Sequence, residues 1–166
     1  MGSKSKKTSS SRNKNIVACF LFLIKDNQVL LLKRQNTGYR DGQYSLISGH
    51  VDAGESFTQA MIREAREEAG LELAPADLRV VHVMHRRSSV DQSERVDVYF
   101  LASSWRSSPA NCEPGKCAEL AWFDRDKLPE ETVPYIRKVL TALNRRQIYS
   151  ERGWQQLSRP KKHDEN

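Results

Sequence analysis

The chain has 166 residues, of which 38% are hydrophobic and 29% are charged. This is about the size of one domain, and the composition provides enough apolar side chains for a core without disulfides or a structural metal. The longest apolar run, residues 16–24, has nine residues, well short of the about 18 that a membrane-spanning helix needs. The composition therefore excludes an integral membrane protein built on helices and predicts one compact enzyme or binding domain.

The formal net charge of +6 is concentrated at the two ends of the chain. Residues 1–15 carry five bases and no acid, and residues 145–166 carry six bases and three acids. Residues 16–144 hold 16 bases and 18 acids, which is a net charge of −2. Basic ends can attract RNA or an anionic membrane, but they more often serve as solvated tails. Nucleic acid is therefore the less favoured partner, and no membrane partner is expected.

The ends of the chain differ from its middle in composition. Residues 1–15 are rich in Ser and Lys and almost free of apolar side chains, which predicts a disordered basic leader without the apolar segment of a signal peptide. Residues 146–166 are predicted to form a basic, partly disordered tail, which leaves residues 16–145 as the domain. Cys19, Cys112 and Cys117 are an odd set without metal-ligand spacing, and this favours reduced thiols and a cytoplasmic location.

The first half of the domain shows two strands, two loops and a helix. Residues 16–24 and 29–32 are apolar runs joined by Asp-Asn-Gln, a pattern that predicts a hairpin. A turn-rich loop at residues 38–42 precedes a short strand near residues 44–47. Ser56 can cap a helix that runs to about Ala69, and Gly70 then provides the helix stop.

The second half predicts three more strands and a second helix. Residues 78–85 and 95–101 alternate or run apolar as strands do, and a loop rich in Ser, Pro and Gly spans residues 103–116. Residues 120–123 form a further short strand, and residues 134–143 form an amphipathic helix with Pro134 in its first turn. The order predicts an α/β fold with a mixed β-sheet between helices.

Three glutamates of the first helix follow a metal-ligand pattern. Glu64, Glu67 and Glu68 have the spacing i, i+3 and i+4, so their carboxylates share one side of a helix. On a helical wheel they border the apolar stripe, whereas Arg63 and Arg66 fall opposite it. Like charges at the edge of a packed face repel unless a cation lies among them, and carboxylates are ligands that Mg²⁺ or Mn²⁺ prefers. The alternative is an ordinary surface helix whose acids pair with arginines.

The segment that contains these acids, residues 49–71, reads GHVDAGESFTQAMIREAREEAGL. Its Gly, Glu and Arg residues have the spacing of the Nudix box, with Ala65 and Leu71 where that motif has an aliphatic residue. Seven such matches at average residue frequencies would arise by chance in about one of 10⁸ windows. Over about residues 16–144 the chain therefore resembles the Nudix hydrolases.

This resemblance implies a Nudix-type α/β/α sandwich and hydrolysis of a nucleoside diphosphate linked to a further group, with Mg²⁺ or Mn²⁺ as cofactor. By motif position Glu64, Glu67 and Glu68 are the implied metal ligands, and Glu64 is a candidate base. Glu55 matches the box glutamate that holds the loop and can reach metal through water, and Arg63 matches its organising partner.

The residues before the box depart from the family pattern. Many members have Pro-Gly there, where this chain has Ile47-Ser48. In some members the carbonyl at the position of Ser48 binds metal, and a backbone ligand tolerates substitution, so we expect altered loop geometry without loss of activity.

Several residues outside the box are candidates for the site. The family often takes its base from another loop, and Glu119 is the candidate here; the alternative is an exposed acid at a strand start. Lys33, Arg34 and Arg40 can bind substrate phosphate, although each also fits an exposed cation. Tyr44 lies where the family often has an aromatic residue, so it can stack on a base or pack in the core.

The box indicates a reaction class but not a leaving group. Relatives that cleave ADP-ribose often have a proline shortly after the box, and those that cleave dinucleoside polyphosphates a tyrosine, but Arg86 and Arg87 stand there. This favours a nucleoside triphosphate or a modified, for example oxidised, nucleotide. ADP-ribose, a nucleotide sugar and the 5′ end of RNA are alternatives, as is a nucleotide-binding module without turnover. Many relatives pair through their sheets, which makes a homodimer compatible with the resemblance.

Overall fold

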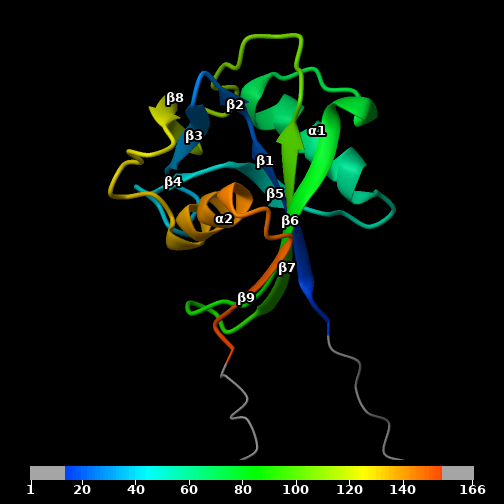
Figure 1. Cartoon of the computed structure of the whole chain (residues 1–166), viewed down its shortest axis with the longest axis vertical. Coiled ribbons are helices and arrows are strands. Elements are labelled where there is room, and N and C mark those ends of the chain that lie inside the picture. Colours follow the sequence, from blue (N-terminus) through cyan, green and yellow to red (C-terminus); the bar gives the residue numbers. More distant parts are fainter. Residues whose placement is uncertain (1–13, 155–166) are drawn as a thin grey trace, which may run out of the picture.

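A computed structural model describes residues 14–154 of the chain (Figure 1). Residues 1–13 of the predicted leader and residues 155–166 of the predicted tail lie outside this range. The elements in chain order are β1 (Ile16–Phe22), β2 (Ile24–Lys25), β3 (Gln28–Arg34), β4 (Tyr44–Ser45), β5 (Ile47–His50), α1 (Phe57–Ala69), the 3₁₀ turn η1 (Pro75–Asp77), β6 (Leu78–Arg87), β7 (Glu94–Ala102), β8 (Cys117–Asp124), α2 (Pro134–Asn144) and β9 (Tyr149–Arg152).

The strands of the described residues form two sheets. The first has the order β5-β1-β7-β6-β9, and in the second β3 pairs with β2, β4 and β8. The pairs β1–β7 and β6–β9 are parallel and the remaining pairs are antiparallel, so the predicted mixed arrangement is confirmed. The chain crosses between the sheets at Leu23, whose carbonyl accepts from Leu30 N at 3.1 Å although Leu23 belongs to neither strand. The predicted single sheet is thus divided.

Both faces of these strands are buried, and this explains their continuous apolar runs. Cys19 and Leu21 of β1 pack with α1 in one core, together with Leu30 of β3. Phe20 and Phe22, which alternate with them, pack in a second core with residues of α2. The two helices therefore cover opposite faces of the strands, as the predicted sandwich requires (Figure 1).

Local signals define helix α1 at both ends. The Ser56 side chain accepts from Gln59 N at 3.2 Å, and the Gln59 side chain accepts from Ser56 N at 2.7 Å, which makes a capping box. Such a cap contributes about 1 kcal/mol. Gly70 ends the helix in the left-handed conformation at φ 64°. The helix buries Ala60, Met61, Ala65 and Ala69, so its orientation over the sheet is fixed along the whole length.

Strand β9 was not predicted from the sequence, where its residues were part of the tail. Residues Tyr149–Arg152 pair in parallel with β6, and Ser150 is buried. The His82 ring makes hydrogen bonds of 2.8 Å to Ser150 Oγ in this strand and to Gln147 O just before it. Neither helix formed by residues 14–154 has the length and apolar character needed to cross a membrane.

Candidate active site

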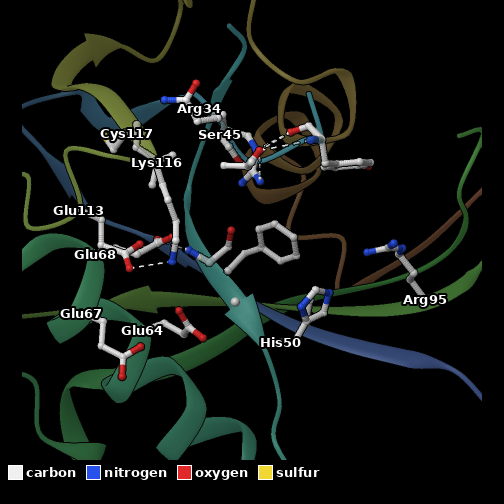
Figure 2. A pocket seen from close by; sticks show the side chains of 18 of the residues that line it. Arg34, Ser45, His50, Glu64, Glu67, Glu68, Arg95, Glu113, Lys116 and Cys117 are labelled. Atoms are coloured by element: carbon white, nitrogen blue, oxygen red, sulfur yellow. Dashed lines mark hydrogen bonds and ion pairs between the residues drawn. The ribbon is translucent and has the colours of Figure 1, made fainter. Parts of the chain in front are cut away.

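A cavity of about 560 Å³ opens beside β5 and α1. Glu64, Glu67 and Glu68 line one side of it (Figure 2). Arg95 lies on the opposite side, beyond His50. The cavity thus has an acidic end formed by α1 and a basic end formed by the sheet, a distribution that suits an elongated ligand with both metal-binding and anionic groups.

The close approach of β5 to α1 depends on Gly49. A Cβ atom at this position would lie 1.9 Å from Cδ and from Oε1 of Glu64, which is far inside van der Waals contact. The Glu64 carboxylate therefore occupies the space that any other residue at position 49 would fill, and glycine keeps this carboxylate at the cavity wall.

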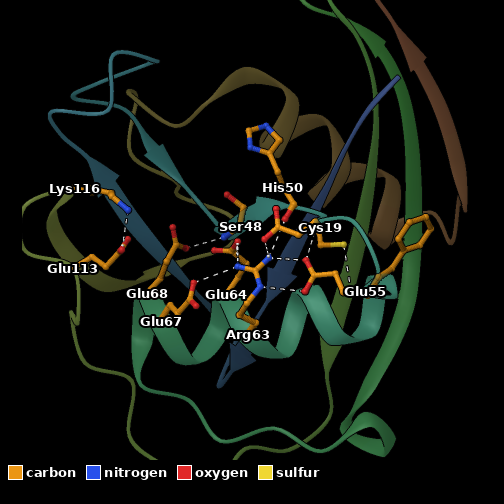
Figure 3. Close-up of polar contacts among 12 residues, drawn as sticks. Cys19, Ser48, His50, Glu55, Arg63, Glu64, Glu67, Glu68, Glu113 and Lys116 are labelled. Carbon is orange, nitrogen blue, oxygen red and sulfur yellow. Dashed lines mark hydrogen bonds and ion pairs between the residues drawn. The ribbon is translucent and has the colours of Figure 1, made fainter. Parts of the chain in front are cut away.

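Arg63 connects the acids of the site (Figure 3). Its guanidinium donates to Glu55 at 2.7 and 3.1 Å, to Glu64 at 2.6 Å, to Glu67 at 3.3 Å and to the carbonyl of His50 at 3.1 Å. The hydrogen bond to Glu55 is the main cause that raises the pKa of Arg63. The same hydrogen bond is the main cause that lowers the pKa of Glu55. The expectation that Arg63 lies opposite the core holds for its backbone position only, because its long side chain reaches back to the acids.

Glu68 is a half-buried carboxylate with little compensation for its negative charge. Its Oε2 accepts from Ser48 N at 2.8 Å, and burial is the main cause that raises its pKa to about 8. Burial also raises the pKa of Glu64, although Arg63 opposes this shift. Without a cation beside them, both side chains therefore ionise less readily than free carboxyl groups do.

These acids fit a divalent cation in chemistry, although residues 14–154 contain no completed group of three metal-binding side chains. Carboxylate oxygens are hard ligands of the kind that Mg²⁺ and Mn²⁺ take. The ionised form of a half-buried carboxylate such as Glu68 is stabilised by a cation brought beside it. Glu67 is 54% exposed and so has room to turn toward the cavity.

Of the candidate site residues predicted outside the Nudix box, some line the main cavity and others do not. Arg34 lines the cavity, where it donates to Tyr39 O at 2.9 Å and to Thr37 Oγ1 at 3.0 Å. Lys33, Tyr44 and Glu119 do not line it. The Tyr44 hydroxyl donates to Glu119, and the Lys33 ammonium lies 5.3 Å from the centre of the Tyr44 ring.

The strand geometry accounts for the position of Glu119. In β8 this residue is the Cα partner of Lys33, whereas Cys117 is the partner of Arg34, with a bulge between them. The bulge changes the alternation of side chains, so Cys117 lines the cavity and Glu119 contacts Tyr44. Arg40 lines a separate, smaller cavity.

Sequence reasoning missed Glu113, which lines the acidic end of the cavity (Figure 3). Its carboxylate receives a hydrogen bond from Lys116 at 2.8 Å, and its N–H donates to Asn111 Oδ1 at 3.2 Å. A loop rich in Pro and Gly gives no periodic pattern, so only the Glu-x-x-Lys spacing within it could have drawn attention to this residue.

The fold and the acid-lined cavity define a NUDIX domain, and the chain belongs to this family: the NUDIX domain model matches residues 13–143. The chain is 33% identical over 107 residues to an ADP-ribose pyrophosphatase of Methanocaldococcus jannaschii. This alignment covers 64% of this chain and 60% of that protein. It is 30% identical over 119 residues to the NAD-capped RNA hydrolase NudC of Shigella dysenteriae, covering 72% of this chain and 43% of that protein.

Among solved structures, a MutT NUDIX hydrolase from Burkholderia pseudomallei superimposes with a TM-score of 0.71 at 27% identity, covering 78% of this chain and 98% of that one. A NUDIX hydrolase from Nitrosomonas europaea has a TM-score of 0.70 at 20% identity, covering 82% of this chain and 93% of that one, a likeness of fold. The two curated relatives are longer, and the chain spans less than two thirds of each.

Proposed function

We propose that the chain is a divalent-metal-dependent pyrophosphohydrolase that cleaves a phosphoanhydride bond in a nucleotide. The observation that carries this proposal is the Glu68 carboxylate, which lies half-buried beside Glu64 at the wall of a 560 Å³ cavity and accepts a hydrogen bond from Ser48 N. Surface acids that served solubility alone would lie in water. Here the acids face a cavity whose other end is basic, as binding of a metal–polyphosphate complex requires.

Each residue has a proposed role. Glu64, Glu67 and Glu68 hold Mg²⁺ or Mn²⁺, with the carbonyl of Ser48 as a further ligand and Glu55 acting through water. When bound, such an ion neutralises phosphate oxygens and lowers the pKa of the attacking water.

The remaining polar residues position these ligands or the reacting water. Arg63 fixes Glu64 and Glu55 by the contacts described above. Arg34 orients substrate phosphate, because its guanidinium lines the cavity. Glu113 is the candidate from outside the box to accept the proton of the attacking water, since it lines the same end of the cavity as Glu68.

Two substrate classes have support. A nucleoside triphosphate or modified nucleotide is supported by the likeness to the MutT NUDIX hydrolase, which the chain covers almost completely. ADP-ribose or a nucleotide-capped RNA is supported by the names of the two relatives at 30% identity or more. Pairing of two copies of the chain stays a prediction.

A substrate panel tests the proposal. Phosphate, pyrophosphate and nucleotide products should be measured with nucleoside triphosphates, oxidised nucleotides, ADP-ribose, dinucleoside polyphosphates and 5′-triphosphorylated or NAD-capped RNA, each with Mg²⁺ and with EDTA. We expect metal-dependent release of a nucleoside monophosphate from at least one class. If the folded protein binds nucleotides but turns over none of them, the chain is a binding module and the proposal is wrong.

A further inference from the structure

A second cavity, of about 250 Å³, lies next to the main one. Tyr39, Arg86 and Tyr135 line both cavities and form the wall between them. No aspartate or glutamate of residues 14–154 lines the second cavity, but it has three further arginines: Arg40, Arg87 and Arg152. The charged side chains that line this cavity are therefore all cationic, which gives it a positive potential.

Three arginines stand in a row across neighbouring strands. Arg86 of β6 is the Cα partner of Arg95 of β7 on one side and of Arg152 of β9 on the other. Directly opposed like charges destabilise a sheet unless anions lie between them. Arg95 pairs with Asp91 at 3.0 Å, and Arg86 with the buried Asp97. Within the part of the chain that the structure describes, Arg152 has no carboxylate partner.

Arg40 adds a further cation to the lining of the second cavity. Its guanidinium donates to the Tyr39 hydroxyl at 3.2 Å and to Gln43 Oε1 at 3.0 Å, and it lies 5.7 Å from the centre of the Tyr135 ring. No described carboxylate pairs with it. Burial opposes ionisation of the Tyr39 phenol, yet the Arg40 hydrogen bond and the neighbouring arginines lower its pKa, which reports a positive potential in this region.

The local sequence holds Arg152 in place. Gly153, at φ 79°, brings the end of β9 so close to β6 that a Cβ atom would lie 2.5 Å from Arg87 O. Ser150 is held by a hydrogen bond of 2.8 Å between its Oγ and the His82 ring. Both Arg152 and Gly153 come after residue 143, where the match to the NUDIX domain ends. The second cavity is therefore completed by a segment that belongs to this chain and not to the matched family region.

We infer that the second cavity binds a phosphate group through Arg40, Arg86 and Arg152. Guanidinium groups present paired N–H donors that match phosphate oxygens, and aromatic rings beneath them limit their motion. Phosphate between Arg86 and Arg152 relieves the repulsion of these two side chains. The phosphate is either a distal group of a ligand in the main cavity, reached across the shared wall, or a separate anion.

Isothermal titration calorimetry of the full chain with inorganic phosphate tests this site. EDTA is included because it keeps cations away from the glutamates, so the result is independent of the proposed hydrolysis. The test variant is R40Q/R152Q. In the wild type neither arginine has a described carboxylate partner, so replacing both leaves no buried acid unpaired. R79Q is the control, since Arg79 is an exposed arginine at the other end of β6.

We expect wild-type protein and R79Q to bind phosphate, and R40Q/R152Q to bind it at least about tenfold more weakly. In wild-type protein, phosphate should shift the Nε–Hε resonances of Arg40 and Arg152 in ¹⁵N spectra. Absence of phosphate binding, equal binding by R40Q/R152Q, or shifts confined to other arginines would overturn the inference.

Two nucleotide probes then identify the source of the phosphate, again in EDTA. If it is a distal group of the same ligand, adenosine 3′,5′-bisphosphate should bind more tightly than adenosine 5′-monophosphate, and R40Q/R152Q should abolish the difference. If it is a separate anion, the two nucleotides should bind equally and inorganic phosphate should bind alongside either. A bisphosphate advantage that persists in R40Q/R152Q contradicts both forms of the inference.

Discussion

The Glu64 carboxylate fills the space beside Gly49 that a side chain there would need, because a Cβ atom on Gly49 would lie 1.9 Å from the Glu64 carboxylate carbon. The Glu64 side chain is only 14% exposed, and Arg63 holds it at 2.6 Å. The position of a proposed metal ligand therefore depends on the absence of a side chain on the neighbouring strand.

Replacing Gly49 with alanine should displace this carboxylate without unfolding the domain, because the clash involves the far end of a flexible side chain. A displacement of about 1 Å at a reacting centre can cost about 100-fold in rate, so we expect a kcat lower by about two orders of magnitude. Thermal unfolding should change little. Gly115→Ala is the control, since nothing lies within 4 Å of a Cβ atom there; equal activities of the two variants would contradict this account.

The Glu68→Gln variant separates metal binding from folding. Its amide keeps the shape of the side chain but removes the charge that burial disfavours, so the metal-free domain should be at least as stable as the wild type. Turnover should fall by orders of magnitude, and calorimetric Mg²⁺ binding should weaken, because a ligand charge is lost. Wild-type turnover by E68Q would remove Glu68 from the proposed metal site.

The two candidate bases outside the box can be compared directly. Glu113 lines the cavity, whereas the Glu119 carboxylate accepts from Tyr44 outside it. General-base catalysis typically contributes about 10²- to 10⁴-fold, so E113Q should lower kcat by at least about 100-fold.

Glu119→Gln should leave kcat within about threefold of the wild type, because it does not reach the cavity. A larger loss in E119Q than in E113Q would return the assignment to Glu119.

The parts of this protein that the sequence predicts are those with local causes. Asp26 and Asn27 adopt φ values of 50° and 62°, as a tight hairpin turn between β2 and β3 requires. Ser56 and Gly70 end α1 as expected from capping chemistry. The spacing of Glu64 and Glu68 on that helix is likewise a local property, which is why the acidic end of the cavity could be anticipated.

The features that the sequence does not predict depend on distant pairing. β9 exists because it pairs with β6, more than sixty residues away, and four residues give too short a pattern to find. Arg86 lies just beyond the predicted strand 78–85, yet β6 includes it and it is buried in an ion pair with Asp97 of β7. The side of β8 on which Glu119 falls is decided by a bulge opposite Lys33 and Arg34, and no local residue pattern signals that bulge.

Tyr99 provides a prediction on stability and pH. Its ring stacks on Phe20 at 4.8 Å within the core, and its buried hydroxyl has no hydrogen-bond partner among the described residues. Burial raises the pKa of this phenol well above its usual value. An unpaired buried polar group costs about 1–3 kcal/mol, so Tyr99→Phe should leave the free energy of unfolding at pH 7 unchanged or raise it by about 1 kcal/mol.

The difference in the free energy of unfolding between Tyr99→Phe and the wild type should grow at alkaline pH. Above pH 10 the phenol of the unfolded chain ionises while the folded protein keeps Tyr99 protonated, so the free energy of unfolding falls as the pH rises. Tyr99→Phe removes this contribution, and its advantage over the wild type in urea unfolding should therefore be larger at pH 11 than at pH 7. Tyr149→Phe, which removes an exposed phenol, should show a smaller difference. Equal pH dependence of all three proteins would mean that Tyr99 ionises as readily in the folded protein as in the unfolded chain, which contradicts this account.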